Sequence, residues 1–335
     1  MLKILGIGNA LVDILIQIED SELQKQGLTK GGMTLIDVQQ MKALEEGFKD
    51  METQQATGGS AANTVLALAL LGDRPGLVGT IGDDTWGNYL RQTAASRGIQ
   101  THFNVVPDAN TGIATTFITP DGERTFATHL GAAAMMKPGI LTEEMLRGYD
   151  ILHIEGYLVQ NHELMEHIVQ TAKEAGLTIS YDLASFNVVL SDREFVTHLV
   201  RDYVDIVFAN REEAAAFCGF DDPEVALDML SKMTRVAVVK LGKDGATATL
   251  SVPETSGTTM TPTERATAPL CSKVKPVDTT AAGDFFAAGF LHGWSQGLPL
   301  RTCLDYGNRI AGEVIRVVGT NVTAEALRAA LIHNS

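Results

Sequence analysis

The sequence is poor in cysteine and in basic residues. Only three of its 335 residues are cysteine, and 26 Lys and Arg stand against 41 Asp and Glu, which gives a formal net charge of −15 at pH 7. Cys218, Cys271 and Cys303 lie far apart and match no zinc or thioredoxin spacing, so we expect reduced thiols in a cytoplasmic protein. Nucleic-acid binding depends on clustered Lys and Arg, and the scarcity of such clusters argues against a nucleic acid as a partner.

Long apolar runs are also missing. The most apolar stretch, MLKILGIGNALVDILIQI at the N-terminus, is interrupted by Asp13 and divided by a glycine-containing turn. No cleavage site of small residues follows it, so the pattern predicts two short strands rather than a signal peptide. No other segment has the length that a membrane span needs, and we expect no membrane partner. With 45% hydrophobic residues, the chain can still bury a large core, as one domain or as two.

Two common nucleotide-binding motifs are absent. The chain has no GxxxxGK[ST] segment, which excludes a Walker-type phosphate loop. In GIGNAL, Leu11 takes the position where the dinucleotide fingerprint needs a small residue. A nicotinamide-dependent oxidoreductase built on an α/β sheet is therefore disfavoured.

Strand patterns alternate with helical patterns along most of the chain. This alternation predicts a three-layer αβα fold, in which helices cover both faces of a mostly parallel sheet. Residues 14–37 and 101–128 instead alternate as half-exposed strands, and we expect them to form a small antiparallel β flap. Residues 252–269 are predicted to form a polar loop rich in Thr and Pro. Buried strands are predicted in ILGIG, PGLVGTIG, DILHIEG, LTISYDL, VDIVFAN and RVAVVKLG.

The segment VDTTAAGDFFAAGF, residues 277–290, places Asp284 directly after small residues. Phe286, Phe290 and Trp294 recur every four residues, which predicts a helix that begins near Ala282 and buries this stripe. The small residues leave the amides of the first turn uncovered, and such amides together with the helix dipole attract anions such as phosphate. In the alternative reading, Asp284 stabilises the dipole of its own helix and the small residues ease close packing.

Two further segments suggest a site for a polar ligand. The glycines of GGSAAN, residues 58–63, allow close backbone approach, and the Asn63 amide can both donate to and accept from hydroxyl groups. A plain glycine turn with Ser60 as helix cap is the alternative. Asp13 is a carboxylate within an apolar run, where it needs a partner such as the hydroxyl groups of a sugar.

Two segments later in the chain are candidates for the nucleotide. NREE, residues 210–213, follows a predicted strand, where a carboxylate can organise a hydrated Mg²⁺ and where a helix cap would look the same. GKDG, residues 242–245, ends another predicted strand. Its glycines allow a nucleotide to lie against bare backbone, and a hairpin turn is the alternative.

Together these motifs resemble the ribokinase-like, or PfkB, carbohydrate kinase family over essentially the whole chain. GGSAAN and DTTAAGD occur in the family's order with NREE between them, GxGNxxxD lies near the N-terminus, and Gly307-Asn308 lies near the C-terminus. The second motif most often reads DTxGAGD in this family, and Ala281 replaces its first glycine. The resemblance implies a ribokinase-like domain over residues 1–335, with 14–37 and 101–128 as a small β-sheet lid.

The resemblance also implies roles for single residues. Asp284 corresponds to the general base that takes a proton from a substrate CH₂OH group, and the amides of Ala281, Ala282 and Gly283 hold the charge that develops on the transferred phosphoryl group. Such a site works by alignment and charge stabilisation, and the helix dipole is expected to keep Asp284 ionised. The other implied positions are Asp13, Gly58, Gly59, Asn63 and Arg124 for the acceptor, Asn210, Gly242, Gly245 and Asn308 for ATP, and Glu213 for Mg²⁺ through water.

The implied substrates are ATP and a small nucleoside or sugar. GIGNALVDI and YVDIVFANREEAAAF are similar to the adenosine kinase branch, which favours a nucleoside. A sugar kinase for ribose, fructose or a related sugar and a non-catalytic binding protein are the alternatives, and the intact Asp284 favours an enzyme. The family further suggests a monovalent cation such as K⁺ and a homodimer formed through the lid.

Overall fold

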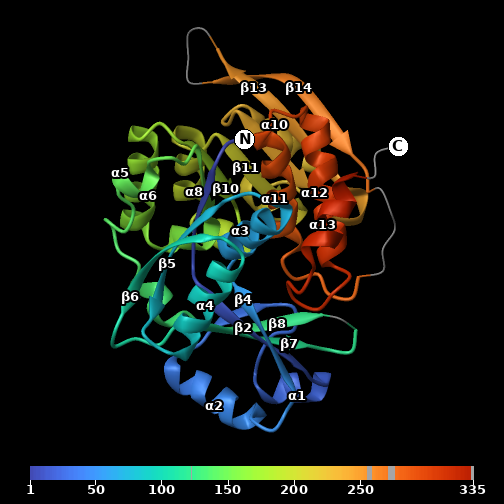
Figure 1. The fold of residues 1–335 in the computed structure, drawn as a ribbon. Helices are drawn as coiled ribbons and strands as arrows, with labels where there is room; N and C mark the ends of the chain where they lie inside the picture. The colour runs from blue at the N-terminus through green and yellow to red at the C-terminus, as the bar shows by residue number, and fades with distance from the viewer. Residues whose placement is uncertain (122, 255–258, 271–275, 333–335) are drawn as a thin grey trace.

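The computed structural model describes residues 1–121, 123–254, 259–270 and 276–332, and it contains two sheets (Figure 1). The larger sheet has nine strands. They are parallel except for β13 and β14, the last two strands in the chain, which form an antiparallel hairpin at one edge. In spatial order they are β14 (Met260–Ala268), β13 (Ala246–Pro253), β12 (Val236–Lys240), β11 (Ile206–Asn210), β10 (Thr178–Asp182), β9 (Ile151–Glu155), β1 (Ile4–Ile7), β5 (Gly76–Gly82) and β6 (Gln100–Val106).

Helices cover both faces of this sheet, so the predicted three-layer αβα fold is confirmed. Each face has its own apolar core, and in Figure 1 one group of helices lies on either side of the strands. One face carries α3 (Ser60–Leu71), α4 (Thr85–Ser96), α11 (Ala282–Ser295), α12 (Leu300–Val314) and α13 (Ala324–Ile332). The other carries α5 (Glu143–Leu146), α6 (His162–Glu174), α7 (Phe186–Ser191), α8 (Arg193–Asp202), α9 (Arg211–Cys218) and α10 (Pro223–Ser231).

A second sheet of five strands lies at the opposite end of the molecule from the β13–β14 hairpin (Figure 1). Two short helices, α1 (Asp20–Lys25) and α2 (Val38–Phe48), close its apolar face with Leu23 and Phe48. The strands in spatial order are β3 (Met33–Leu35), β8 (Arg124–His129), β7 (Gly112–Ile118), β2 (Leu11–Gln17) and β4 (Thr53–Gly58).

This small sheet corrects the predicted flap. Residues 101–106 were expected in it, but they lie in β6, which pairs in parallel with β5 at the edge of the large sheet. The segment 14–37 is only partly strand, since α1 interrupts it, and β4 was not predicted. The sheet is also mixed rather than antiparallel, because β2 pairs in parallel with β7. Half-exposed alternation is typical of the edge strands of any sheet, so the pattern does not tell which sheet a strand joins.

The prediction of a loop over residues 252–269 is also wrong for most of the segment. β13 continues to Pro253 and β14 occupies Met260–Ala268, so most of the segment forms an antiparallel hairpin, with 255–258 outside the described residues. Threonine is β-branched and suits a half-exposed edge strand, which explains why a polar Thr-rich segment pairs here.

The strand predictions for the large sheet are confirmed. The six predicted buried strands correspond to β1, β5, β9, β10, β11 and β12. Cys218 and Cys303 are free buried thiols, and Cys271 lies outside the described residues. Within the described ranges, no helix combines the length and the apolar character needed to cross a membrane.

An aromatic cluster fixes the helix that carries Asp284. α11 begins at Ala282 as predicted and packs the fully buried ring of Phe290 edge-on against Phe208 of β11, with 5.3 Å between ring centroids. Trp294 stacks on the other side of Phe290 at 6.2 Å. The position of the helix over the large sheet therefore depends on these rings.

We predict that Phe290→Ala lowers the free energy of unfolding by about 3–5 kcal/mol, because it opens a cavity beneath α11 that the fixed sheet cannot fill. Urea unfolding followed by circular dichroism measures the loss. Phe220→Ala is the matched control, since Phe220 is 64% exposed and should change stability by less than about 0.5 kcal/mol. Equal losses in the two variants would contradict the role of Phe290.

Candidate active site

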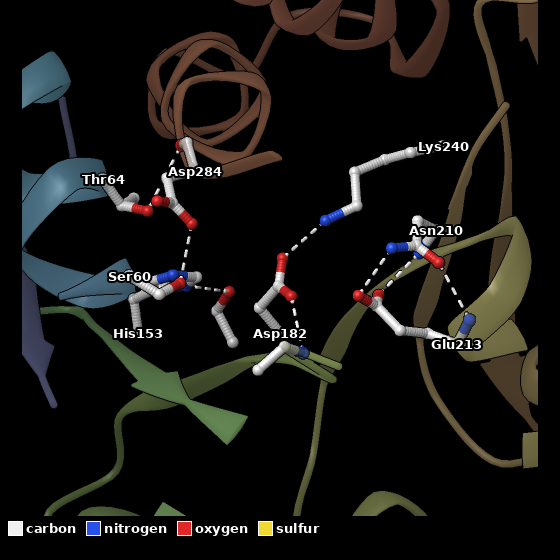
Figure 2. Close-up of polar contacts among 10 residues, drawn as sticks. Ser60, Thr64, His153, Asp182, Asn210, Glu213, Lys240 and Asp284 are labelled. Carbon is white, nitrogen blue, oxygen red and sulfur yellow. Dashed lines mark hydrogen bonds and ion pairs between the residues drawn. The ribbon is translucent and has the colours of Figure 1, made fainter. Parts of the chain in front are cut away.

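Asp284 lies in the first turn of α11, where it meets the first turn of α3 (Figure 2). Its carboxylate accepts a hydrogen bond from Ser60 Oγ at 2.7 Å and another from Asn63 Nδ2 at 2.9 Å. Thr64 Oγ1 donates to the Asp284 backbone carbonyl at 3.2 Å. The motifs GGSAAN and DTTAAGD, far apart in the chain, are thus joined through one carboxylate.

The pKa of Asp284 is raised to about 6. Burial is the largest cause and raises this pKa, and the negative charge of Asp182 raises it further. The hydrogen bonds from Ser60 and Asn63 and the positive charge of Lys240 lower it. The expectation that the helix dipole alone keeps this group ionised is therefore incomplete, because burial outweighs the groups that favour the charged form. A carboxyl group with this pKa can exchange a proton near neutral pH.

The residues before Asp284 leave the start of α11 open. Ala281 adopts the left-handed conformation, with φ 59°, and its methyl group makes no cap. Glycine accepts this conformation without strain, which accounts for the glycine that the family usually has here. A Cβ added at Gly283 would meet one group within 4 Å, the Lys240 ammonium at 3.1 Å. The Ala282 amide donates to the Thr279 carbonyl oxygen at 3.3 Å, so the space beside Gly283 is the open side of this turn. Anion binding by these amides stays a prediction.

Asp13 lies on β2, is nearly fully buried, and is close enough to Asp284 for the two charges to interact. Burial raises its pKa to about 7, the charge of Arg124 lowers it, and that of Asp284 raises it. A Cβ at Gly58 would lie 2.2 Å from Asp13 Oδ1. Gly58 therefore makes room for the Asp13 carboxylate, a role that the sequence did not indicate.

Gly59 makes room for a neighbouring backbone segment. It has φ 98°, and a Cβ there would lie 2.0 Å from the Asn9 carbonyl oxygen. The glycine thus lets the chain turn sharply into α3 beside β1. The close approach that the paired glycines predicted is an approach to this protein's own atoms at both positions.

Arg124 comes from β8 of the small sheet, and its side chain is buried. It forms an ion pair with Asp278, which begins the DTTAAGD motif. Asp278 also accepts hydrogen bonds from the amides of Thr280 at 2.7 Å and Gly319 at 2.5 Å. Within the described residues, Nε and Nη1 of Arg124 have no hydrogen-bond partner.

Asn210 and Glu213 form a reciprocal helix cap at the start of α9. Asn210 donates from its amide nitrogen and from Nδ2 to the two Glu213 carboxylate oxygens, both at 2.7 Å, and its Oδ1 accepts from the Glu213 amide at 2.8 Å. Burial raises the Glu213 pKa, which the charge of Lys240 partly offsets. The helix-cap interpretation of NREE is therefore confirmed, and a role of these residues toward a metal remains a prediction.

Gly242, Gly245 and Asn308 lie together beside the end of β12. A Cβ at Gly245 would lie 2.0 Å from the Ala268 carbonyl oxygen, and Asn308 Nδ2 donates to that same oxygen at 2.8 Å. These two residues thus fix the hairpin against α12. Gly242 has φ 58° and no atom within 4 Å of an added Cβ, so it is the one of the three that borders open space.

Three polar residues of the site were missed from the sequence: Asp182, Glu155 and Lys240. Glu155 ends β9 and accepts hydrogen bonds from Asn9 Nδ2 at 2.6 Å and from the Ala61 amide at 3.2 Å. Burial raises its pKa to about 7. Each of the three is the last residue of a strand that had been predicted as buried. Polar residues at the carboxyl ends of parallel strands face the ligand side of an open sheet, and this signal could have found them.

Comparison with known proteins places this chain in a family. The family model described as pfkB family carbohydrate kinase matches residues 25–327. The chain is 30% identical to adenosine kinase of Dictyostelium discoideum over 96% of its own length and 97% of that protein. It is 32% identical to ATP-dependent ribose-1-phosphate kinase of Halopiger xanaduensis, covering 76% of this chain and 79% of the relative.

A solved structure agrees with these relatives. The crystal structure of adenosine kinase from Sinorhizobium meliloti superposes with a TM-score of 0.88 at 31% identity, covering 98% of each chain. The three-layer fold is therefore the ribokinase-like fold of such kinases. The chain belongs to the pfkB family of carbohydrate kinases and is a phosphotransferase that acts on an alcohol group.

Proposed function

We propose that this enzyme transfers the γ-phosphoryl group of ATP to a CH₂OH group of a ribosyl compound, most readily a nucleoside. The observation that carries the proposal is Asp284, a half-buried carboxylate with a pKa of about 6 at the start of α11. A general base is most effective when its pKa lies near the working pH, because it is then both ionised and able to take a proton.

The proposed reaction uses two features of this helix start. Asp284 takes the proton of the acceptor hydroxyl, whose oxygen forms a bond to the γ-phosphorus while the bond to the ADP oxygen breaks. Of the three amides that the resemblance implied, those of Ala281 and Gly283 stabilise the charge on the transferred group, because they are fixed in place before the reaction begins. The third, of Ala282, already donates to Thr279 at 3.3 Å. Ser60 and Asn63 orient the carboxylate through their hydrogen bonds.

The residues present fit Mg²⁺ bound mainly through phosphate. In the described ranges, no group of three or more His, Cys, Asp or Glu is arranged to hold a metal ion. Mg²⁺ bound with nucleotides usually keeps several waters and takes only one or two carboxylates, so such a group is not needed. When bound, the ion would neutralise phosphate charge. Glu213 would contact it through water, since Asn210 already engages both carboxylate oxygens, and Gly242 would border ATP.

A nucleoside acceptor is supported by features on the other side of Asp284. Asn63 Oδ1 is buried and has no hydrogen-bond partner among the described residues, so it is free to accept from a sugar hydroxyl next to Asp13. Met33 and Leu35 on β3 expose apolar surface that a base can cover and a bare sugar cannot. The adenosine kinase of Dictyostelium discoideum also aligns with nearly the whole chain.

A sugar or sugar phosphate is the second candidate acceptor. Two nitrogens of the buried Arg124 guanidinium have no hydrogen-bond partner in the described part of the chain, and Arg recognises phosphate well. One relative is named ATP-dependent ribose-1-phosphate kinase.

The K⁺ requirement and a dimer formed through the five-stranded sheet remain predictions.

Asp284→Asn is predicted to fold normally and to lower kcat by about 10²–10⁴-fold, because it removes the proposed base and keeps its shape. Coupled measurement of ADP release with Mg-ATP and adenosine tests this. Asp228→Asn on α10, which has an exposed side chain, serves as the matched control and should leave kcat unchanged. Wild-type turnover by a folded Asp284→Asn enzyme would exclude the proposed base.

The pH dependence provides a second test. Since Asp284 acts as a carboxylate and has a pKa of about 6, kcat/KM should fall tenfold per pH unit below about pH 6 and level off above it. Initial rates between pH 4.5 and 8, in buffers of constant ionic strength, measure the profile. A plateau that continues unchanged to pH 4.5 would show that no group with this pKa must be ionised.

Substrate preference is tested with adenosine, inosine, cytidine, ribose, fructose, ribose 1-phosphate and 2′-deoxyadenosine. We expect adenosine to have the highest kcat/KM. The 2′-deoxy analogue should react about ten- to a hundredfold more slowly, because it leaves a buried polar group without its hydroxyl partner. A higher kcat/KM for ribose 1-phosphate or a free sugar would show that the nucleoside assignment is wrong, while the assignment as a kinase would stand.

A further inference from the structure

Lys240 is a buried cation at the centre of the site, and none of the roles described so far uses it. It ends β12, its side chain is 12% exposed, and its Nζ donates to Asp182 Oδ2 at 2.8 Å. Figure 2 shows the Lys240 side chain reaching to the Asp182 carboxylate. A buried ion pair is weak evidence for stability, since an apolar pair of the same volume often stabilises a fold as well. Packing alone therefore does not explain a lysine here.

The ammonium also lies against the helix start that faces phosphate. Its Nζ is 3.1 Å from the position of a Cβ on Gly283, so the charge and the open amides of that turn border the same space. An ammonium has three N–H donors, and in the described ranges Asp182 is the one acceptor bonded to it. Two donors thus remain for the oxygens of a ligand.

The surrounding charges show what this cation does. Burial lowers the pKa of Lys240, but Asp182, Glu213 and Asp284 act in the opposite direction and leave it raised, so the ammonium keeps its proton. Without it, a phosphate that approached the start of α11 would meet three carboxyl groups and would lose the cation that lies against Gly283. The chain also lacks the lysine of a Walker-type loop, which supplies this charge in other nucleotide sites.

We propose that Lys240 is a catalytic residue that binds the transferred phosphoryl group, and that Asp182 is the positioning residue that holds it there. This inference rests on the proposed role of Asp284. The acceptor oxygen bonds to the γ-phosphorus, the bond to the ADP oxygen breaks, and the acceptor proton goes to Asp284. Lys240 keeps its proton throughout and donates hydrogen bonds to the phosphoryl oxygens. Asp182 is itself fixed, since its Oδ1 accepts from the Ala184 amide at 2.9 Å.

The test compares Lys240→Met with the double variant Asp182→Asn/Lys240→Met. In Lys240→Met we expect kcat to fall by about 10²–10³-fold, the size of effect seen when one donor to a developing charge is removed. The KM for the acceptor should stay within about twofold, because uniform binding is unaffected. Unchanged kcat would overturn the inference.

The double variant separates catalysis from charge neutralisation. If Lys240 only compensates buried Asp182, removing both charges restores turnover, and that result would overturn the proposal. If Lys240 binds the phosphoryl group, the double variant stays as slow as Lys240→Met. The double variant also secures the test against misfolding, since removal of a whole buried pair is tolerated better than removal of one partner. Thermal melts of all variants check folding.

A change in the nucleotide identifies the contact. Wild-type enzyme should have a higher kcat with ATP than with ATPγS, which carries sulfur on the γ-phosphorus. The ratio of the two kcat values should be smaller in Lys240→Met. An unchanged ratio would overturn the proposed contact. Asp284→Asn is measured in parallel. If this variant retains turnover, the proposed active site itself is wrong. If it loses turnover while Lys240→Met keeps full activity, only the role of Lys240 is rejected.

Discussion

The hydrogen bonds from α3 to the Asp284 carboxylate join the two halves of the site. Ser60 and Asn63 begin one helix, Asp284 begins another, and the two helices pack side by side on the same face of the large sheet. Each helix start has a positive dipole end, so the two starts and their hydrogen bonds favour the charged carboxylate, whereas burial outweighs them and raises its pKa. The position and orientation of the base follow from this contact.

Several acids are buried around this contact, and they affect stability. Burial raises the pKa of Asp13 and Glu155 to about 7, well above their ordinary values. The folded chain therefore binds protons more tightly than the unfolded chain between about pH 4 and pH 7, and these two groups lower the free energy of unfolding as the pH rises through that range. The arrangement thus reduces stability at neutral pH and places titratable groups where a substrate can meet them.

The sequence predicted much of the fold and part of the site. Buried parallel strands leave continuous apolar runs, so the strands that carry Glu155, Asp182 and Lys240 were recognised. The residues themselves were missed, because their meeting depends on strand order and on which strand ends share an edge. The role of Gly58 was hidden for the same reason, since it appears only when β4 lies beside β2 and the Asp13 carboxylate fills the space. Half-exposed segments such as 101–106 were assigned to the wrong sheet because alternation records exposure and not pairing.

The buried ion pair between Arg124 and Asp278 has a mechanical consequence. It connects β8 of the five-stranded sheet to the loop that leads into α11, and Asp278 is in turn anchored by the amides of Thr280 and Gly319. Removing one partner of such a pair typically costs about 3–5 kcal/mol, so the two sides resist separation. A displacement of the small sheet is therefore transmitted to the start of the helix that bears Asp284. The small sheet and the start of α11 are therefore coupled through a single guanidinium.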